Sequence, residues 1–448
     1  MKRLSIVAMI GVMGTLLVEG VPCYVATNGS HSSPYDTWAK AATNIQSAVS
    51  YVGGSSPGET VWISNGIYYL NAPISVTNVK VRGFSGHPED VIVDGGEATR
   101  CFYLNHANNE LSGLTISNGY IVDTGAGIRC EKYAVISNCI IAGNVASNNG
   151  GSGIYIATDS GGSLLTDSTV CGNRCIGSGG SPYGGGVYTS STNAQIRNTT
   201  IVSNYAAFGG GVYMNPSGGS MQNCLISRNT AASIGGGVYI SYTGTVYNCE
   251  ISDNVCNTGS GSSGGAIYII GNNNAMNIVV RNCLVKNNMS GYWKGGSGIW
   301  CDGGGWIQNC TIVSNKASQG GGSCYGGGMY STTTNARVLN CIIYSNQATA
   351  NSDWYSSVAG MVFSNSCSST TNGMVGTGNK TNNPQFVSAV GENYRLTENS
   401  LCINAGLNEA WMNGAVDLNG YQRIDQFSAQ VDMGAFEYLP QGSLFMVR

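Results

Sequence analysis

The stretch NTTIVSNYAAFGGGVYMNPSGGSMQNCLISRNTAASIGGGVYI, residues 198–240, contains two motifs that recur along most of this 448-residue chain. One is Asn-Cys-x-Ile-x-x-Asn with close variants, and the other is Gly-Gly-Val-Tyr. The closing asparagine of the first motif occupies positions 118, 144, 173, 204, 229, 254, 288, 315 and 346. Its average spacing is about 28 residues, a period that indicates a solenoid or a related repeat architecture.

Because successive side chains of a strand point to opposite faces, the repeat predicts which residues face the interior. Tyr213 is flanked by the apolar Val212 and Met214, so we expect the flanking side chains to point inward and the ring outward. In the other motif, parity places both Asn223 and Cys224 inward, which requires a bend at the asparagine. Asparagine tolerates the left-handed backbone that such a bend needs. Each unit is therefore predicted to contain three short strands, with the bend asparagines stacked into an amide ladder.

One strand per sheet in every unit predicts an all-β parallel β-helix, a solenoid of about eleven coils including the ends. The 66 glycines are consistent with this fold, because each coil needs a turn before its aromatic strand. The low share of charged residues, 10% of the chain, is also consistent with it, because stacked coils bury one face of each strand. A net charge of −3 excludes the basic footprint of a nucleic-acid-binding protein. The 42% of hydrophobic residues also excludes a disordered acidic chain.

The N-terminal end differs from the repeating middle. Residues 1–20 carry Lys2 and Arg3 before an apolar run and are predicted to be a signal peptide, with a lipoprotein acylated at Cys23 as the alternative. Residues 21–110 are predicted to form an N-terminal cap and the first coils. They contain the one stretch with helical spacing, Trp38–Val52, whose expected buried face is Ile45, Ala48, Val49 and Val52. Short strands are expected over Glu59–Ile63, Ile67–Leu70, Val79–Arg82 and Val91–Val93.

The remaining boundaries follow from where the periodicity holds. Residues 111–350 are predicted to form the β-helix repeats, and residues 351–448 a terminal coil with a C-terminal cap module. The helix near residue 45, the asparagine ladder and the strand pattern resemble the right-handed parallel β-helix, or pectin-lyase-like, superfamily over roughly residues 23–375. The segments NPQF, SLCINAG, DLNGYQR and VDMGAFEY, which begin at residues 383, 400, 417 and 431, resemble the terminal module called choice-of-anchor Q. That resemblance implies a secreted or cell-surface protein.

Outward aromatic residues recur once per coil and form a predicted stripe of rings. Its members are Tyr155, Tyr188, Tyr213, Tyr239, Tyr268, Trp300 and Tyr330. Sugar rings stack their apolar faces on such rings, so the stripe, with Asp302 beside Trp300, is a candidate glycan-binding surface. The resemblance implies the same, because the strand after the long loop lines the substrate cleft of polysaccharide-acting β-helices. The alternative is that the stacked rings only stabilise the rod.

A candidate catalytic group lies at the first coils of the same face. Arg129 and Glu131 are predicted to point outward, and Asp159, one coil further, can approach Glu131. The resemblance implies lyases with acidic calcium ligands and a basic proton acceptor, or hydrolases with clustered carboxylates. Asp302 is six coils from Glu131 and too far to complete a carboxylate pair. A surface salt bridge explains the same residues equally well.

Cysteine and metal chemistry offers few further candidates. Six cysteines share one inward slot and are expected to pack as small buried thiols, namely Cys139, Cys224, Cys249, Cys283, Cys310 and Cys341. Cys171 with Cys175, and Cys367 with Cys402, are positions where an exported protein forms disulfides. No cofactor is expected, although Asp417, Asp425, Asp432 and Glu437 are candidate Ca²⁺ ligands, with turn and cap roles as the alternative. The histidines show no metal-ligand spacing.

These observations predict an exported, monomeric β-helix that binds a polysaccharide or surface glycan and performs no catalysis. A polysaccharide lyase or glycoside hydrolase, and a purely structural surface protein, are the two alternatives. No nucleic-acid partner and no transmembrane span in the mature chain are expected.

Overall fold

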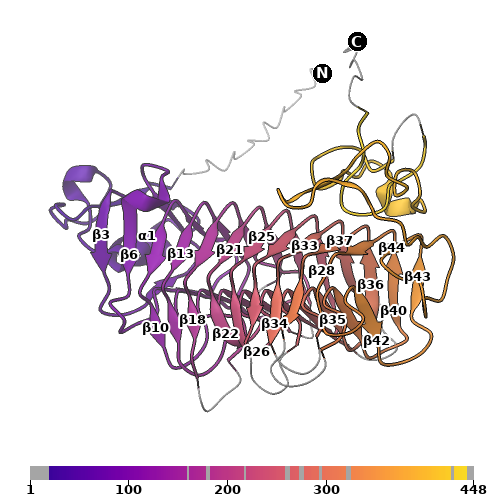
Figure 1. The fold of residues 1–448 in the computed structure, drawn as a ribbon. Helices are drawn as coiled ribbons and strands as arrows, with labels where there is room; N and C mark the ends of the chain where they lie inside the picture. Colours follow the sequence, from indigo (N-terminus) through magenta and orange to yellow (C-terminus); the bar gives the residue numbers. More distant parts are fainter. Residues whose placement is uncertain are drawn as a thin grey trace, which may run out of the picture.

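The computed structural model describes residues 20–158, 161–177, 182–215, 218–257, 263–271, 277–291, 295–318, 324–424 and 428–440. In these residues the chain winds into a long rod of parallel strands with about ten turns (Figure 1). Each strand of the rod pairs in register with its equivalents one turn away, so the repeat in sequence becomes a stack in space. The predicted all-β parallel β-helix is confirmed, with a turn count close to the expected eleven.

Three long sheets run along the rod. Sheet A has 13 strands: β1 (Cys23–Val25), β2 (Thr60–Ile63), β5 (Lys80–Gly83), β8 (Asn109–Ser112), β12 (Ala134–Ser137), β16 (Leu164–Thr166), β20 (Gln195–Arg197), β24 (Ser220–Gln222), β28 (Gly244–Tyr247), β32 (Ile278–Arg281), β36 (Gly305–Gln308), β40 (Ala336–Leu339) and β43 (Val362–Ser364). Sheet B has 12 strands: β3 (Gly66–Tyr69), β6 (Val91–Asp94), β9 (Thr115–Ser117), β13 (Ile140–Ala142), β17 (Thr169–Cys171), β21 (Thr200–Val202), β25 (Leu225–Ser227), β29 (Glu250–Ser252), β33 (Leu284–Lys286), β37 (Thr311–Val313), β41 (Ile342–Tyr344) and β44 (Cys367–Ser368). Sheet C, which carries the aromatic residues, has 11 strands: β4 (Ile74–Val76), β7 (Phe102–Leu104), β11 (Ile128–Cys130), β15 (Ile154–Ile156), β19 (Val187–Thr189), β23 (Val212–Met214), β27 (Val238–Ser241), β31 (Ile267–Ile270), β35 (Ile299–Cys301), β39 (Met329–Ser331) and β42 (Trp354–Ser356).

A fourth, shorter sheet corrects the expectation of three strands per unit. Sheet D has eight strands: β10 (Tyr120–Ile121), β14 (Val145–Ala146), β18 (Arg174–Cys175), β22 (Tyr205–Phe208), β26 (Thr230–Ile234), β30 (Val255–Cys256), β34 (Met289–Gly291) and β38 (Lys316–Ser318). Its strands follow the closing asparagines, and several contain only two residues. A two-residue strand cannot complete a period-two alternation, so the sequence pattern showed only a loop there.

One continuous apolar cluster fills the rod with the inward residues of sheets A, B and C. Val212 and Met214 are fully buried in it, as the alternation predicted. The inward cysteines also belong to this cluster, and the thiols of Cys224 and Cys249 each donate to a backbone carbonyl 3.2 Å away. All sixteen cysteines are free thiols in the structure, which confirms that the inward column packs as small buried groups.

The bend asparagines adopt the predicted left-handed conformation, and φ is 54° at Asn223. Their side chains nevertheless point outward, which corrects the expectation of two inward residues in succession. A left-handed residue interrupts the strand alternation, so the next residue, Cys224, resumes the inward position. Asn198 and Asn223 are exposed, and the Asn223 amide donates to Asn198 Oδ1 at 3.2 Å. These residues form an outer amide ladder on the surface of the rod.

The N-terminal end of the rod is covered by the only α-helix in the described residues, α1 (Ile45–Ser55). A 3₁₀ turn at Trp38–Lys40 precedes it, so the predicted helix begins later than expected. The side chain of Asn44 caps the helix by accepting from the backbone N–H of Ser47, which explains where the helix starts. The predicted face of Ile45, Ala48, Val49 and Val52 is buried. A further 3₁₀ turn lies at Pro88–Asp90.

Residues 380–424 and 428–440 form a compact module against the C-terminal half of the rod, shown in yellow in Figure 1. The module contains the antiparallel pair β45 (Phe386–Ser388) and β46 (Asn393–Leu396) and a 3₁₀ turn at Ala410–Met412. It covers outward residues of sheet B such as Leu284 and Ile342. It also hydrogen-bonds the outer asparagine ladder, because Asn340 donates to Leu407 O at 2.9 Å and accepts from Leu407 N at 2.7 Å.

Candidate functional site

The predicted aromatic stripe exists as a continuous column on the outer side of sheet C. Register pairs Arg129, Tyr155, Tyr188, Tyr213, Tyr239, Tyr268, Trp300, Tyr330 and Tyr355 on successive turns. Ring centroids of neighbours lie 5.1 Å apart for Tyr155 and Tyr188, and 4.1 Å apart for Trp300 and Tyr330. The rings are edge-on at the N-terminal end, stacked from Tyr213 to Tyr330, and tilted between Tyr330 and Tyr355. The predicted aromatic residues thus form one column along the sheet.

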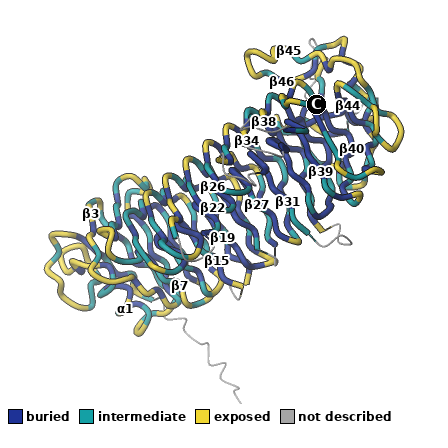
Figure 2. Tube along the Cα trace, turned by 60° about the horizontal axis from the view of Figure 1, so that its bottom comes forward, coloured by how far each residue is buried: buried dark blue, intermediate teal, exposed yellow. Residues whose placement is uncertain are grey.

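Most rings of the column are covered by neighbouring side chains, although they project from the outer side of the sheet. Trp300 is 3% exposed and Tyr213 is 6% exposed, and the Tyr183 ring lies tilted against Tyr213 with the centroids 4.4 Å apart. Figure 2 shows β27 and β31 mostly in dark blue, with exposed residues concentrated at outer turns and at the two ends. Burial raises the pKa of Tyr188 and of Tyr239 to about 12. The middle of the column therefore has little ring surface left for a ligand.

Asp302 follows β35 beside Trp300, as predicted, and its carboxylate is already engaged. It accepts a hydrogen bond from the Tyr268 hydroxyl at 3.2 Å and another from the Thr332 hydroxyl. Burial, followed by the charge of Asp302, raises the pKa of Tyr268 well above its ordinary value. These contacts fix the Tyr268 ring against Trp300 and make Asp302 part of the column's support.

The predicted catalytic residues Arg129 and Glu131 form an ion cluster at the N-terminal end of sheet C. Arg129 pairs with Glu131 and with Asp123, and its guanidinium lies 5.4 Å from the centroid of the Tyr155 ring. Burial acts to lower the pKa of Arg129, but the hydrogen bonds and charges of Glu131 and Asp123 outweigh it, so the pKa is raised. Arg129 is therefore held as a cation. Asp159 lies outside the described residues.

A surface hollow of about 550 Å³ lies at the opposite, C-terminal end of the column. Tyr355 lines it, and its ring is stacked on Tyr325 at 4.7 Å and lies 5.4 Å from Tyr330. Trp354 also lines the hollow but is only 7% exposed. The rest of the wall consists of hydroxyl, amide and apolar side chains and two glycines, namely Asn351, Ser356, Ser357, Val358, Ala359, Gly360, Met361, Thr370, Asn372, Gly373 and Val375. None of the described lining residues is charged. This combination of one accessible ring with neutral polar groups is typical of a site for an uncharged polar ligand.

Sequence reasoning missed two parts of this face. Tyr355 continues the column, and its signal was the segment DWYS at residues 353–356, which repeats the aromatic strand without its glycines. Arg100 and Tyr103 extend the Arg129 cluster, since the Arg100 guanidinium lies 5.9 Å from the Tyr103 ring and donates to two backbone carbonyls. The alternation FYL at residues 102–104 already marked Tyr103 as outward.

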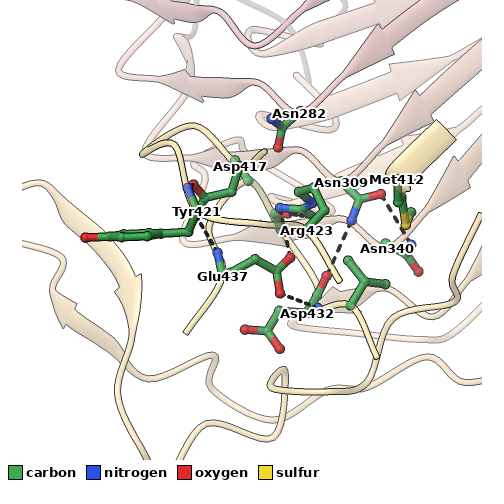
Figure 3. A network of polar contacts seen from close by, with 12 residues as sticks. Asn282, Asn309, Asn340, Met412, Asp417, Tyr421, Arg423, Asp432 and Glu437 are labelled. Carbon is green, nitrogen blue, oxygen red and sulfur yellow. Dashed lines mark hydrogen bonds and ion pairs between the residues drawn. The ribbon is translucent and has the colours of Figure 1, made fainter. Parts of the chain in front are cut away.

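The candidate calcium ligands of the C-terminal module lie around a buried arginine instead of an open site (Figure 3). Arg423 is fully buried and pairs with Glu437 at 3.1 Å. The Asp417 carboxylate accepts from the backbone N–H groups of Asn419, Tyr421 and Glu437. Asp432 accepts from the N–H groups of Asn404 and Tyr438. The described carboxylates thus act as turn and cap groups here, and Asp425 lies outside the described residues.

Two further features of the described residues concern metal binding and membranes. In the described ranges, no group of three or more His, Cys, Asp or Glu side chains is placed to hold a metal ion. No helix among the residues that the structure describes combines the length and apolarity needed to cross a membrane. The calcium prediction therefore gains no supporting site.

Comparisons with known proteins bear on the fold. Among solved structures, pectate lyase Pel9A is 15% identical at a TM-score of 0.47, with 93% of this chain and 96% of that chain covered. XylC in complex with xylose is 9% identical at a TM-score of 0.48, covering 93% and 98%. The alginate lyase AlyGC of family PL6 is 12% identical at 0.40, covering 80% and 56%. A search of curated proteins found no match. The sequence model of the family described as "Right handed beta helix region" matches residues 181–331, and together with the strand register it establishes the fold class as an all-β, right-handed parallel β-helix.

Proposed function

We propose that this protein binds glycans at the C-terminal end of sheet C, in the hollow beside Tyr355. The observation that carries the proposal is the combination of a volume of about 550 Å³ with an aromatic ring and neutral hydroxyl and amide groups. Ligand sites of proteins commonly enclose about 300–1,000 Å³. Sugars offer apolar ring faces for stacking and hydroxyl groups for hydrogen bonds, so both halves of the lining have a partner.

The ligand class follows from the charges. Because none of the described lining residues is charged, a neutral sugar residue loses less hydration on entry than a uronate would. The stacked column behind Tyr355 holds its ring in place, which reduces the entropy lost on binding. Tyr213 and Tyr268 are too buried to test binding by substitution, because their loss would act first on folding.

The test is retention of the protein on an array of neutral and acidic polysaccharides, followed by calorimetric titration with the oligosaccharides that bind. We expect the variant Tyr355→Ala to lose about five- to thirtyfold in affinity, since one stacking ring contributes on the order of 1–2 kcal/mol. Tyr69→Ala is the matched control, because Tyr69 is 73% exposed on β3 and far from the hollow in the fold. Equal affinity of wild type and Tyr355→Ala would overturn the proposal.

Cleavage of a polysaccharide is the second candidate function. The observation that favours it is the cluster at Arg129, where a guanidinium and two carboxylates meet on the same outer face of sheet C. A cationic Arg129 suits the binding of a uronate carboxylate more than proton abstraction, which requires a lowered pKa. Incubation with pectate, alginate and xylan, reading ultraviolet absorbance of unsaturated products and reducing ends, tests this candidate. Activity that disappears in Arg129→Gln would establish it, and no product from any substrate would eliminate it for these substrates.

We also propose that the protein is exported. The support is the sequence of residues 1–20, with its two basic residues and apolar run. Expression of the full chain with analysis of the mature N-terminus tests the proposal. A secreted product beginning near Val21 is expected, and retention of Met1 in the cytoplasmic fraction would contradict it.

A further inference from the structure

Two cysteines meet at the interface between the last coil and the C-terminal module. Cys367 opens β44 and pairs in register with Ile342. Ile342 and Cys367 belong to an apolar cluster that includes Leu396, Cys402 and Met433 of the module. Both cysteines are buried, at 0% and 1% exposure, and the Cys367 thiol donates to Asn382 O at 3.2 Å. The interface therefore places two thiols in one buried cluster, and the neighbouring Cys402 thiol contributes to raising the pKa of Cys367.

The two thiols approach from opposite sides. Ile343, which follows Ile342 in β41, lies in the central core, so Ile342 and its register partner Cys367 point outward from the rod. Ser366, which precedes Cys367, occupies the inward slot and accepts from the backbone N–H of Cys341. Cys402 belongs to the module that covers this outer face, so its side chain points back toward the rod. Facing Cβ atoms are what a disulfide requires.

The inward cysteine column provides an internal comparison. Cys224 and Cys249 contact each other, with the Cys224 N–H donating to Cys249 Sγ at 3.4 Å. They stand on neighbouring parallel strands and point the same way, so their Cβ atoms are held near the strand spacing of about 4.8 Å. A disulfide needs a Cβ separation of about 3.5–4.5 Å. The strand spacing therefore disfavours a disulfide in this column, whereas Cys367 lies in β44 and Cys402 in the module, so that spacing does not hold them apart.

The other pair named from the sequence does not share this geometry. Cys171 lies half-buried at the end of β17 in sheet B, and Cys175 lies in β18 of sheet D. The Cys175 thiol is buried with Ala146 and Ala206 and donates to the carbonyl of Asn149. The structure therefore separates the two candidates that spacing alone treated alike.

We propose that Cys367 and Cys402 form a disulfide that fastens the C-terminal module to the last coil. The oxidant is a disulfide of the exchange class, either a small-molecule disulfide or an oxidoreductase. One cysteine thiolate attacks the oxidant's sulfur–sulfur bond and releases one thiol, and the second cysteine then attacks the mixed disulfide and releases the other. Two cysteine thiols and one oxidant disulfide become one protein disulfide and two oxidant thiols.

The bond would act on a part of the fold that the repeat does not stabilise. Each coil is held by neighbours on both sides, but the module is held only along one surface of the rod. A disulfide across that surface closes the chain between β44 and the module and restricts the undocked state.

The experiment uses the full chain purified without reductant and equilibrated with oxidised glutathione. It is then denatured in guanidinium with an alkylating reagent and digested for mass spectrometry. We expect every one of the sixteen cysteines to be alkylated except Cys367 and Cys402, which should appear in one cross-linked peptide. Full alkylation of both residues, or a cross-link between other cysteines, would overturn the proposal.

A second measurement links the bond to the module. Addition of a phosphine reductant should release the module to limited proteolysis at least about tenfold faster in wild type. Cys402→Ser should be cleaved at the fast rate with or without reductant. Cys341→Ser is the matched control, a buried cysteine of the inward column, and should respond to reductant as wild type does. A wild-type rate that is indifferent to reductant would contradict a fastening role, even with the cross-link present.

Discussion

Asn204 donates its side-chain amide to Oδ1 of Asn229 across 3.0 Å in the interior of the rod, where both residues are at most 1% exposed. The same contact repeats on successive turns from Asn144 to Asn346 and ends on the carboxylate of Asp353. Each amide also donates to an inward backbone carbonyl, such as Ile201 O for Asn229. This inner ladder satisfies backbone groups that the turn between sheets B and D leaves without a strand partner.

Asn229→Ala should destabilise the rod strongly. The substitution removes the acceptor of the Asn204 amide and the donor to Ile201 O, and each unsatisfied buried group costs about 1–3 kcal/mol. We expect a loss of about 3–5 kcal/mol in the free energy of unfolding, measured by urea denaturation. The exposed Asn65→Ala is the control and should change it by under about 0.5 kcal/mol. Similar effects of the two substitutions would mean that the ladder adds no stability.

Trp300→Ala tests the buried part of the aromatic column. Trp300 is 3% exposed and stacks on Tyr330 at 4.1 Å, so its removal leaves a cavity. Large-to-small substitutions of buried aromatic residues cost about 3–5 kcal/mol, and the melting temperature should fall accordingly. Tyr69→Ala, at a ring that is 73% exposed, should leave the melting temperature nearly unchanged. A stable Trp300→Ala variant would instead support an open, ligand-facing column.

Glu437 should make the module less stable as the pH rises. Burial raises the pKa of Glu437 to about 8, despite the nearby Arg423. The folded state therefore keeps a proton that the unfolded chain releases near its ordinary pKa of about 4.5. The stabilising contribution of Glu437 is fully present below pH 4.5 and is lost as the pH rises toward about 8. Between these two pKa values, the free energy of unfolding falls by up to about 1.4 kcal/mol per pH unit.

Glu437→Gln is the variant that checks this pH dependence. A neutral amide does not titrate, so the decrease in denaturation midpoint between about pH 5 and pH 9 should be smaller than in wild type. Asp417, whose pKa burial also raises, contributes to the slope that remains. Identical slopes for variant and wild type would show that Glu437 is not the titrating group.

Asn340→Gly should loosen the docking of the module while leaving the bend intact. Glycine accepts the left-handed φ of 53° at this position, so the substitution removes the side chain without backbone strain. It deletes the hydrogen bonds with Leu407 N and O, worth about 1 kcal/mol each. Asn223→Gly, at an exposed bend with φ of 54°, is the matched control. Limited proteolysis should cut the module faster only in Asn340→Gly, and equal rates would contradict this role of the outer ladder.

Prediction from the sequence succeeded where a rule repeats in every coil. The alternation around Tyr213 predicted the buried Val212 and Met214, and the left-handed bend at Asn223 followed from its place between two strands. The same rules failed for sheet D, whose strands are too short to show a pattern. They also missed Tyr355, because the last aromatic strand has lost the glycines that marked the others.

The candidate site was less predictable than the fold. The alternation of side chains along a strand predicts on which face of the sheet a ring lies. The column of rings on sheet C confirms that face. The alternation does not predict which other chain segments cover the ring. Tyr183 and Tyr325 lie against the column from the segments before the aromatic strands, and their positions depend on how those segments fold back.

The sequence by itself determined the parallel stacking of the coils. A fixed period, inward apolar positions and a residue that accepts a left-handed bend are local properties, and parallel register then follows from one coil to the next. Only the tertiary structure decided which of these surfaces are accessible, because accessibility depends on chain segments distant in sequence. The module buries the outer asparagines near Asn340, brings Cys402 to Cys367 and gathers three carboxylates around Arg423, while the covered column leaves Tyr355 at the edge of an open hollow.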